Sequence, residues 1–277
     1  MALLFRNYGQ LSRRLFSKTV PSFKRCMSSS SGLDLRYNDD VAVITMRNKE
    51  NRLNATFLKD FNSLLDSVEG NEACRGLITT GEGKFYGNGI ELDWLSTVPV
   101  EELLTFLHDL NAFFRRVLLL PIPTMAMMNG HAFAGGAMMA AAHDLRTMNS
   151  EKGWFCFNEV FLSICLSNFF MAFLRVKLGG GKNLSDALVL GRRYTAADAI
   201  DKGIADAAFP PSSLDEESLK LLRSYIGKEG IPRAGVAKMK NHLYEGAEAV
   251  FQAEAAENFV NFSLQLMSEE QRDLHRK

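Results

Sequence analysis

The sequence predicts an α/β fold with a helical C-terminal region. Short β-type runs alternate with segments whose apolar residues recur at helical spacing, which gives repeated strand–strand–helix units. Helical patterns dominate from about residue 168 onward. Two glycine-rich runs lie where predicted strands pass into helices. Together these observations define the fold class and locate the segments most informative about function.

The first half of the chain alternates between strands and helices. A β-type run over 41–46 precedes a helix over 54–69, in which Phe57, Phe61 and Leu64 share one face. The next predicted elements are a strand over 76–80, a helix over 103–120 that ends at Pro121, and a short buried strand over 124–128.

The second half begins with a helix of small residues over 136–142, followed by predicted strands over 144–148 and 152–157. The predicted helices of the C-terminal part cover 169–177, 183–190, 196–202, 214–225 and 234–267. The run Gly179-Gly180-Gly181-Lys182 is similar to a phosphate-binding loop, but Asn183 follows it in place of Ser or Thr. We therefore interpret this run as a helix C-cap.

Charge is unevenly distributed along the chain. The 277 residues carry no formal net charge, and 47% are hydrophobic. Residues 1–33 hold six basic residues and no acidic one, which leaves 26 basic against 32 acidic residues, or about −6, in the remainder. A net-acidic body argues against nucleic-acid binding, which usually needs a basic face.

The N-terminal segment is rich in Arg and Ser and contains interspersed apolar residues, a composition typical of a mitochondrial transit peptide. Arg13-Arg14 interrupts the apolar core that a secretory signal needs. A disordered basic tail is the alternative. The C-terminus is not a Ser-Lys-Leu peroxisomal address. We therefore expect the protein in the mitochondrial matrix rather than in peroxisomes.

The four cysteines form no Cys-x-x-Cys pair, so they indicate neither a zinc site nor a disulfide framework. Cys156 and Cys165 stand among apolar residues and are expected to be small buried hydrophobes. No apolar run is long enough to span a membrane. We expect no metal site and no membrane span.

The two glycine-rich runs cover 84–92 and 129–138. Glycines between a strand and a helix can present unhindered backbone N–H groups. Two such donors aimed at one point form an oxyanion hole, and removing one costs about 3–4 kcal/mol of transition-state stabilisation. Tight turns are the alternative for glycine runs taken alone.

One carboxylate follows in otherwise apolar sequence. Phe155, Phe157, Phe161 and Leu162 surround Glu159 along the chain, and apolar surroundings raise the pKa of a carboxyl group and make it a better base. Two amide clusters and one base indicate proton transfer beside a carbonyl. A salt-bridged structural role is the alternative for Glu159.

Two histidines, His131 and His143, flank the predicted helix of small residues. No G-x-S-x-G elbow accompanies them, so the sequence does not predict acyl-transfer hydrolysis.

Residues 33–256 resemble the enoyl-CoA hydratase/isomerase, or crotonase, superfamily in four segments. Asn51 to Asn54 is similar to its N-x-L-N motif, and Phe85 to Leu92 to its F-x-x-G-x-D-L element. Asn129 to Gly136 is similar to N-G-x-x-x-G-G, and Gly191 to Asp206 to G-R-x-x-x-A-x-x-A…G-L-V-D. The resemblance implies a crotonase-type spiral of repeated ββα units with a C-terminal helical region, assembled as a homotrimer or a dimer of trimers.

The resemblance also implies site residues. The oxyanion donors would be the N–H groups of Ile90 and Gly135, and the residues lining the acyl-CoA site would be Asn88, Gly89, Ile90, Glu91, Leu92 and Gly135. For Glu91 we consider a structural bond more consistent with the sequence than catalysis.

Hydratases of the superfamily use two glutamates, and this sequence has Met138 at the first of these positions and Glu159 at the second. Losing one member of an acid–base pair costs about 10²–10⁴ in rate, so we do not expect efficient hydration.

One carboxylate suffices to move a double bond from position 3 to position 2, by carrying a proton from C2 to C4. The context of Glu159 also resembles the mitochondrial Δ3,Δ2-enoyl-CoA isomerases. The resemblance therefore implies a 3-enoyl-CoA to 2-trans-enoyl-CoA isomerase of unsaturated fatty acid oxidation, in which coenzyme A is part of the substrate and no cofactor is needed. The alternatives are a hydratase or another CoA-thioester enzyme that uses Glu159 alone, and a catalytically silent scaffold.

These inferences divide the chain into three parts. We expect a transit peptide over 1–32, a crotonase-fold catalytic core over 33–225 and a helical oligomerisation region over 226–277.

Overall fold

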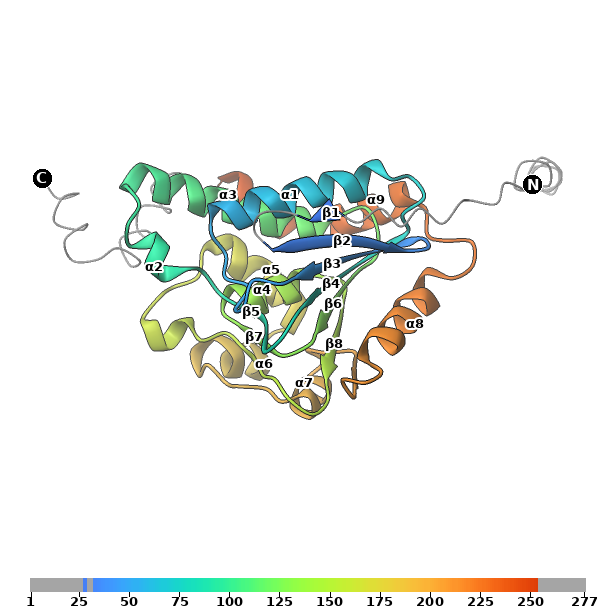
Figure 1. Cartoon of the computed structure of the whole chain (residues 1–277). Helices are drawn as coiled ribbons and strands as arrows, with labels where there is room; N and C mark the ends of the chain where they lie inside the picture. The colour runs from blue at the N-terminus through green and yellow to red at the C-terminus, as the bar shows by residue number, and fades with distance from the viewer. Residues whose placement is uncertain (1–26, 29–31, 254–277) are drawn as a thin grey trace, which may run out of the picture.

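A computed structural model of the chain describes residues 27–28 and 32–253. In these residues a seven-stranded sheet and a three-stranded sheet are surrounded by helices (Figure 1). The larger sheet has the order β1-β2-β3-β4-β6-β8-β10, and the smaller one β5-β7-β9.

The strands of the larger sheet are β1 (Met27–Ser28), β2 (Leu33–Asn38), β3 (Val41–Met46), β4 (Gly76–Gly81), β6 (Thr124–Met128), β8 (Leu145–Asn149) and β10 (Ala207–Phe209). Those of the smaller sheet are β5 (Phe85–Asn88), β7 (His131–Phe133) and β9 (Phe155–Cys156). The pairs β1–β2 and β2–β3 are antiparallel, and all other pairs are parallel. The mixed α/β class that the sequence predicts is confirmed.

The helices are α1 (Ala55–Gly70), α2 (Leu92–Leu95), α3 (Val100–Leu119), α4 (Gly135–Ala142), α5 (Asn168–Leu178), α6 (Lys182–Leu184), α7 (Ala196–Asp201), α8 (Leu214–Ile226), α9 (Arg233–Leu243) and α10 (Glu245–Ala253). A 3-10 turn, η1 (Glu159–Leu162), and a π-helical turn, η2 (Ser185–Val189), complete them.

Both faces of the larger sheet are buried. Val41 and Val43 of β3 contribute to a core that also contains Leu222 of α8. Their neighbours Ala42 and Ile44 point to the other face and belong to the main core, which includes residues of α1, α3, α4 and α5. This alternation follows from the two-residue period of a strand, and it explains why the strands are apolar on both sides.

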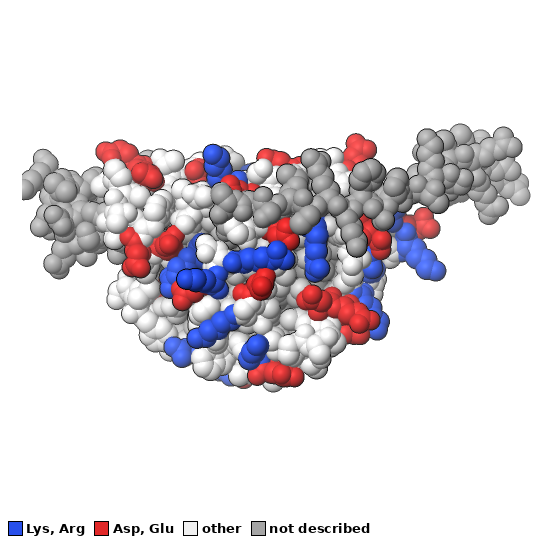
Figure 2. All heavy atoms as spheres, viewed as in Figure 1, with Lys and Arg blue, Asp and Glu red and all other residues white. Residues whose placement is uncertain are grey.

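Figure 2 shows basic and acidic side chains interspersed on the viewed face of the molecule. That face therefore does not present the single-sign basic surface that a nucleic-acid backbone requires. None of the helices within 32–253 is long and apolar enough to cross a membrane.

Most of the predicted helices are confirmed to within a few residues. Asn54 caps α1 by accepting a hydrogen bond from Phe57 N at 2.8 Å. Gly179, with φ of 70°, is the C-cap of α5, as the glycine run predicted. The helix predicted over 183–190 consists of α6 followed by the π-helical turn.

The strand prediction was less complete. The strand expected over 152–157 is reduced to Phe155–Cys156. Sequence analysis did not identify β1, β2, β5, β7 or β10.

The single helix predicted over 234–267 is wrong in its described part. The chain forms α9 and α10 instead, separated at Tyr244, which has φ of −105° and ψ of 17°. Tyr244 is buried, with Lys177 Nζ 5.3 Å from the centre of its ring. The break directs α10 onto α5, where Phe251 packs edge-on against Phe169. Residues 254–267 lie outside the described residues.

The proposed domain boundaries stay predictions. Most of the expected transit peptide, 1–32, lies outside the described residues, although Met27–Ser28 pairs with β2 in antiparallel register. Within the expected oligomerisation region, Glu248 of α10 accepts hydrogen bonds from both Nε and Nη2 of Arg115 in α3, at 2.5 and 2.6 Å. The described part of that region therefore packs against the core of its own chain.

Candidate active site

The three strands of the smaller sheet bring the predicted site residues together. Asn88 of β5 pairs with Phe133 of β7, and Phe133 pairs with Cys156 of β9. Because all three strands are parallel, the segments that follow them leave the sheet at the same edge. Ile90, Gly135 and Glu159 are each two or three residues beyond these paired positions. The carboxyl ends of parallel strands are where α/β proteins place their ligands.

The backbone of Leu53 orients the N–H group of Ile90. Leu53 N donates to Gly89 O at 2.8 Å, and Glu91 N donates to Leu53 O at 2.9 Å. In this parallel bridge the C=O of Gly89 and the N–H of Glu91 point toward Leu53. The N–H of Ile90 is trans to the C=O of Gly89 in the same peptide group, so it points away from Leu53. No acceptor for this N–H is found among residues 32–253. Sequence analysis identified Leu53 only as part of a motif and missed this role.

Gly135 is the first residue of α4, and its N–H precedes the helical hydrogen bonds. The first of these bonds runs from Met138 N to Ala134 O at 2.9 Å. Ala134 has φ of 48°, a backbone conformation that costs about 1–3 kcal/mol for a residue other than glycine. It turns the chain sharply from β7 into the helix, and Ala134 N is tied to Cys156 O of β9 at 3.0 Å.

The two amide-bearing segments lie in contact. A Cβ atom placed on Gly89 would be 3.6 Å from Gly135 N and 2.9 Å from Ala134 Cβ. Two N–H groups on adjacent segments, one of them at a helix N-terminus, are the components of an oxyanion hole. That the N–H groups of Ile90 and Gly135 are its donors stays a prediction. The contact between the two segments is consistent with that prediction.

Glu159 begins η1 and is 9% exposed. Burial raises the pKa of its carboxyl group to about 7, and its Oε2 atom is buried without a hydrogen-bond partner among the described residues. The adjacent Asn158 Oδ1 is also buried and unpartnered in that range. An ionisable group with an unmatched oxygen and a pKa near neutrality is suited to exchanging a proton with a ligand.

The apolar surroundings of Glu159 differ in part from those expected. Phe155 and Phe157 are buried, whereas Phe161 and Leu162 are 66% and 50% exposed. Both residues belong to the 3-10 turn that Glu159 begins, and they lie largely at the surface. Burial raises the pKa of Glu159, and of the four apolar neighbours along the chain only Phe155 and Phe157 are themselves buried.

The sequence profile of the enoyl-CoA hydratase/isomerase family matches residues 36–274 of this chain. The chain belongs to that family. Enoyl-CoA delta isomerase 2, peroxisomal, of Arabidopsis thaliana is 31% identical over 182 residues, which cover 63% of this chain and 75% of the relative. A putative enoyl-CoA hydratase of Thermus thermophilus is 31% identical over 193 residues, covering 68% and 75%.

Solved structures of the family share the fold. The crystal structure of human mitochondrial delta3-delta2-enoyl-CoA isomerase superposes with a TM-score of 0.78 and 19% identity, covering 88% of this chain and 96% of that one. At that level of identity the likeness shows the fold alone. It confirms the crotonase-type architecture that the resemblance implied.

The register of one family element needs a correction. The F-x-x-G-x-D-L pattern places its aromatic residue three positions before the glycine. Counted back from Gly89, that residue is Tyr86, one position later than the Phe85 with which we began the match. Tyr86 is fully buried, whereas Phe85 is only partly buried.

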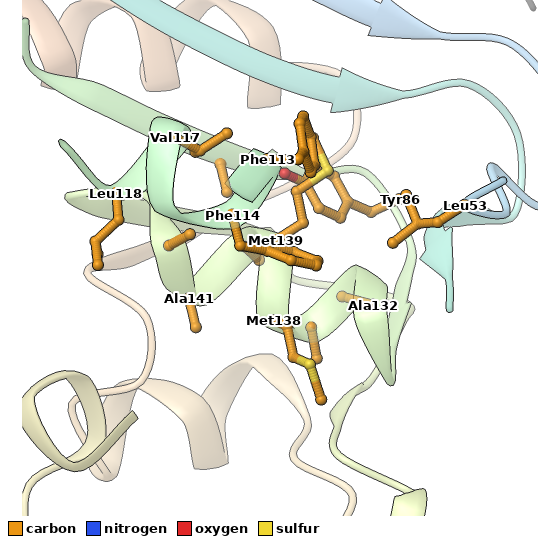
Figure 3. Close-up of a cluster of buried hydrophobic side chains, with 14 of the residues drawn as sticks. Leu53, Tyr86, Phe113, Phe114, Val117, Leu118, Ala132, Met138, Met139 and Ala141 are labelled. Carbon is orange, nitrogen blue, oxygen red and sulfur yellow. The ribbon is translucent and has the colours of Figure 1, made fainter. Parts of the chain in front are cut away.

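Met138 occupies the position of the first glutamate of family hydratases and is 4% exposed. Figure 3 shows Met138 and Met139 extending in opposite directions from α4, with Met139 beside Phe113. A thioether side chain cannot titrate or orient a water molecule as a carboxylate does.

The other predicted binding residues have structural partners. Asn88 Nδ2 donates to Glu50 Oε2 at 3.1 Å, and Asn54 Nδ2 donates to Glu91 Oε2 at 2.5 Å. Leu92 is 40% exposed. Glu91 therefore links two loops at the edge of the site, in keeping with a structural bond.

Cys165 is exposed, which contradicts our expectation of a buried residue, whereas Cys156 is buried as predicted. Within residues 32–253 no cluster of three His, Cys, Asp or Glu side chains could hold a metal ion.

A pH profile tests the environment of Glu159. With Glu159 in its predicted role as the base, only its carboxylate form is active, and kcat/KM for an enoyl-CoA substrate should fall about tenfold per pH unit below the pKa and level off above it. With the pKa of Glu159 raised to about 7, we expect the bend near neutrality. Initial rates between about pH 5 and 9 measure this. A profile that is flat down to pH 5 would contradict the raised pKa.

Proposed function

We propose that this protein isomerises 3-enoyl-CoA to 2-trans-enoyl-CoA. One observation carries the proposal: a buried glutamate, Glu159, has an unpartnered oxygen at the strand ends that also present the N–H groups of Ile90 and Gly135. The family model covers hydratases and isomerases, and the Arabidopsis thaliana relative named enoyl-CoA delta isomerase 2, peroxisomal, supports an isomerase.

In the proposed reaction, Glu159 removes a proton from C2 of the substrate. The electron pair left on C2 delocalises into the thioester carbonyl and the double bond, which gives a dienolate. The N–H groups of Ile90 and Gly135 donate hydrogen bonds to the dienolate oxygen, and the N-terminus of α4 favours its negative charge. Glu159, now protonated, returns the proton to C4, and the double bond then lies between C2 and C3. One carboxyl group therefore suffices, because it takes up one proton and returns one proton while the electron pair stays within the substrate.

Met138 distinguishes this reaction from hydration. Adding water to a 2-enoyl thioester needs one group to activate the water and another to protonate carbon. Met138, a buried methionine at the position of the first hydratase glutamate, leaves Glu159 without that partner. We therefore expect isomerisation to exceed hydration.

The test uses the full chain and 3-trans-hexenoyl-CoA. Formation of the conjugated 2-enoyl thioester is followed by its near-ultraviolet absorbance, and the products are separated to quantify any 3-hydroxyacyl-CoA. The proposal expects conjugation with little hydration. Hydration of 2-hexenoyl-CoA without conjugation of the 3-enoyl substrate would favour a hydratase, and binding without turnover would favour a silent scaffold.

We also propose import into the mitochondrial matrix, on the composition of residues 1–32. Relatives include plant isomerases named as peroxisomal and a human isomerase named as mitochondrial. A fluorescent reporter fused behind residues 1–32 should enter mitochondria, and a cytosolic or peroxisomal reporter would refute the proposal.

A homotrimer or a dimer of trimers stays a proposal from the family resemblance. Sedimentation of the purified full chain measures it, and a monomer would refute it.

A further inference from the structure

A buried chain of hydrogen bonds connects β5 with the C-terminal end of α4. Tyr86 Oη of β5 lies 2.7 Å from Thr79 Oγ1 of β4, and Thr79 Oγ1 lies 3.0 Å from His143 Nε2. His143 is the C-cap residue of α4, and its Nδ1 lies 2.8 Å from Met139 O. All three side chains are fully buried. The proposed proton transfer uses none of them.

The direction of each bond follows from its chemistry. A carbonyl oxygen only accepts, so His143 Nδ1 carries a hydrogen and donates it to Met139 O. Burial lowers the pKa of His143 to about 3, so the ring is neutral and its Nε2 accepts. The Thr79 hydroxyl therefore donates to His143, and the Tyr86 hydroxyl donates to Thr79. Every polar atom of these three side chains is satisfied in one consistent arrangement.

These hydrogen bonds link β5 to the C-terminal end of α4, a helix that is also in contact with β5 at its N-terminal end. At the N-terminal end of α4, the backbones of Gly136 and Gly87 are in direct contact, since a Cβ atom on Gly136 would lie 2.2 Å from Gly87 O. α4 also packs against α3, α5, β6 and β7, and the hydrogen bonds add a directional link to β5 at the end of the helix opposite Gly135. Figure 3 shows the Tyr86 ring beside Met139 of α4.

The C-terminal end of α4 is itself held by two basic side chains. Lys177 Nζ and Arg146 Nη1 both donate to His143 O, at 2.7 and 2.8 Å. Positive charge at this end of a helix is favourable. His143 is thus anchored through its backbone to α5 and β8, and through its side chain to β4 and β5.

We propose that Tyr86, Thr79 and His143 are positioning residues that set the separation between the N–H groups of Ile90 and Gly135. Tyr86 lies four residues before Ile90 on one side, and His143 ends the helix that Gly135 begins on the other. The inference rests on the proposed oxyanion hole and adds the device that holds its two donors in register.

The experiment replaces the central hydroxyl. Thr79→Val removes both bonds with little change of shape, and Thr79→Ser retains the hydroxyl. Tyr86→Phe removes only the outer bond. Thr147→Val is the matched control, because the buried Thr147 hydroxyl bonds Ser218 Oγ at 2.7 Å on the side of the sheet that faces α8.

Two readouts separate positioning from stability. One is kcat and KM with 3-trans-hexenoyl-CoA. The other is the absorbance of bound 2,4-hexadienoyl-CoA, a conjugated thioester that absorbs at longer wavelength when its carbonyl oxygen accepts stronger hydrogen bonds. We expect Thr79→Val to lower kcat by about 10–100-fold with KM changed by less than about threefold, and to diminish the absorbance shift. Tyr86→Phe should act in the same direction and carries the test if Thr79→Val does not fold.

Wild-type behaviour of Thr79→Ser and Thr147→Val beside the loss in Thr79→Val would support the proposal. A full absorbance shift and unchanged kcat in Thr79→Val, or an equal loss in Thr147→Val, would overturn it. A wild-type protein that binds the dienoyl thioester without any shift would instead refute the oxyanion hole, and this inference with it.

Discussion

Glu159→Gln is expected to reduce isomerase turnover by about 10⁴, the upper end of the range for general acid–base catalysis. The loss should be large because in the proposed reaction one carboxyl group performs both proton transfers, and because the amide has nearly the same shape but cannot accept the C2 proton. Substrate binding should change little, since the amide occupies the same volume. Rates of conjugation with 3-trans-hexenoyl-CoA measure the first effect, and the affinity for a saturated acyl-CoA measures the second.

The same substitution should stabilise the fold above neutral pH. The folded-state pKa of Glu159, about 7, lies above the ordinary value of 4.5, so unfolding becomes easier as the pH rises between these values. Above pH 7 the buried charge costs up to about 3 kcal/mol, which glutamine removes. The difference in stability between the two proteins should vanish below about pH 4.5.

Thermal unfolding at several pH values measures this difference. Glu216→Gln, at an exposed position of α8, is the control and should alter neither stability nor turnover appreciably. A Glu159→Gln protein that retains turnover would remove Glu159 from the reaction. A protein that loses turnover and also loses stability at pH 8 would indicate a structural role for the carboxylate, as in a salt bridge.

The sequence predicted the helices well because their signals are local. Asn54 before the apolar spacing of α1 and Gly179 after α5 are start and stop signals that act within one turn. The strands β5 and β7 were missed because they are short and lie inside glycine-rich runs. They exist through pairing with each other and with β9 rather than through their own composition.

The candidate site could be predicted only as a set of residues. The family motifs indicated Ile90, Gly135 and Glu159, but not that Leu53 turns one amide outward, nor that Ala134 adopts a positive φ to begin α4. The hydrogen bonds that connect the side chains of Tyr86, Thr79 and His143 join three segments separated by up to 64 residues. No spacing rule in a single sequence reveals such a contact. The exposure of Phe161 likewise depends on the turn after Glu159, which sequence periodicity does not specify.

Gly136→Ala is expected to lower kcat by about a hundredfold through displacement of α4 from β5. The added methyl carbon would lie 2.2 Å from Gly87 O and 2.4 Å from Gly87 C, and both are backbone atoms that cannot rotate away. The two segments must therefore separate by close to 1 Å, a misplacement that can cost about a hundredfold in rate when it affects reacting groups. Since one segment leads to Ile90 and the other begins with Gly135, the separation acts directly on the two proposed oxyanion donors.

Gly235→Ala separates this effect from a general consequence of adding a methyl group to a helix. Gly235 lies in α9, has no atom within 4 Å of the position of its Cβ, and has no positive φ, so alanine should stabilise the protein by about 0.5–1 kcal/mol without altering kcat. Gly136→Ala should instead destabilise it by about 1–3 kcal/mol, as overpacking does. Steady-state kinetics at a temperature where both variants are folded isolate the effect on kcat. A wild-type kcat in folded Gly136→Ala would mean that the proton transfer does not depend on the contact between α4 and β5. The proposal that the N–H groups of Ile90 and Gly135 act as joint donors would then have to be abandoned.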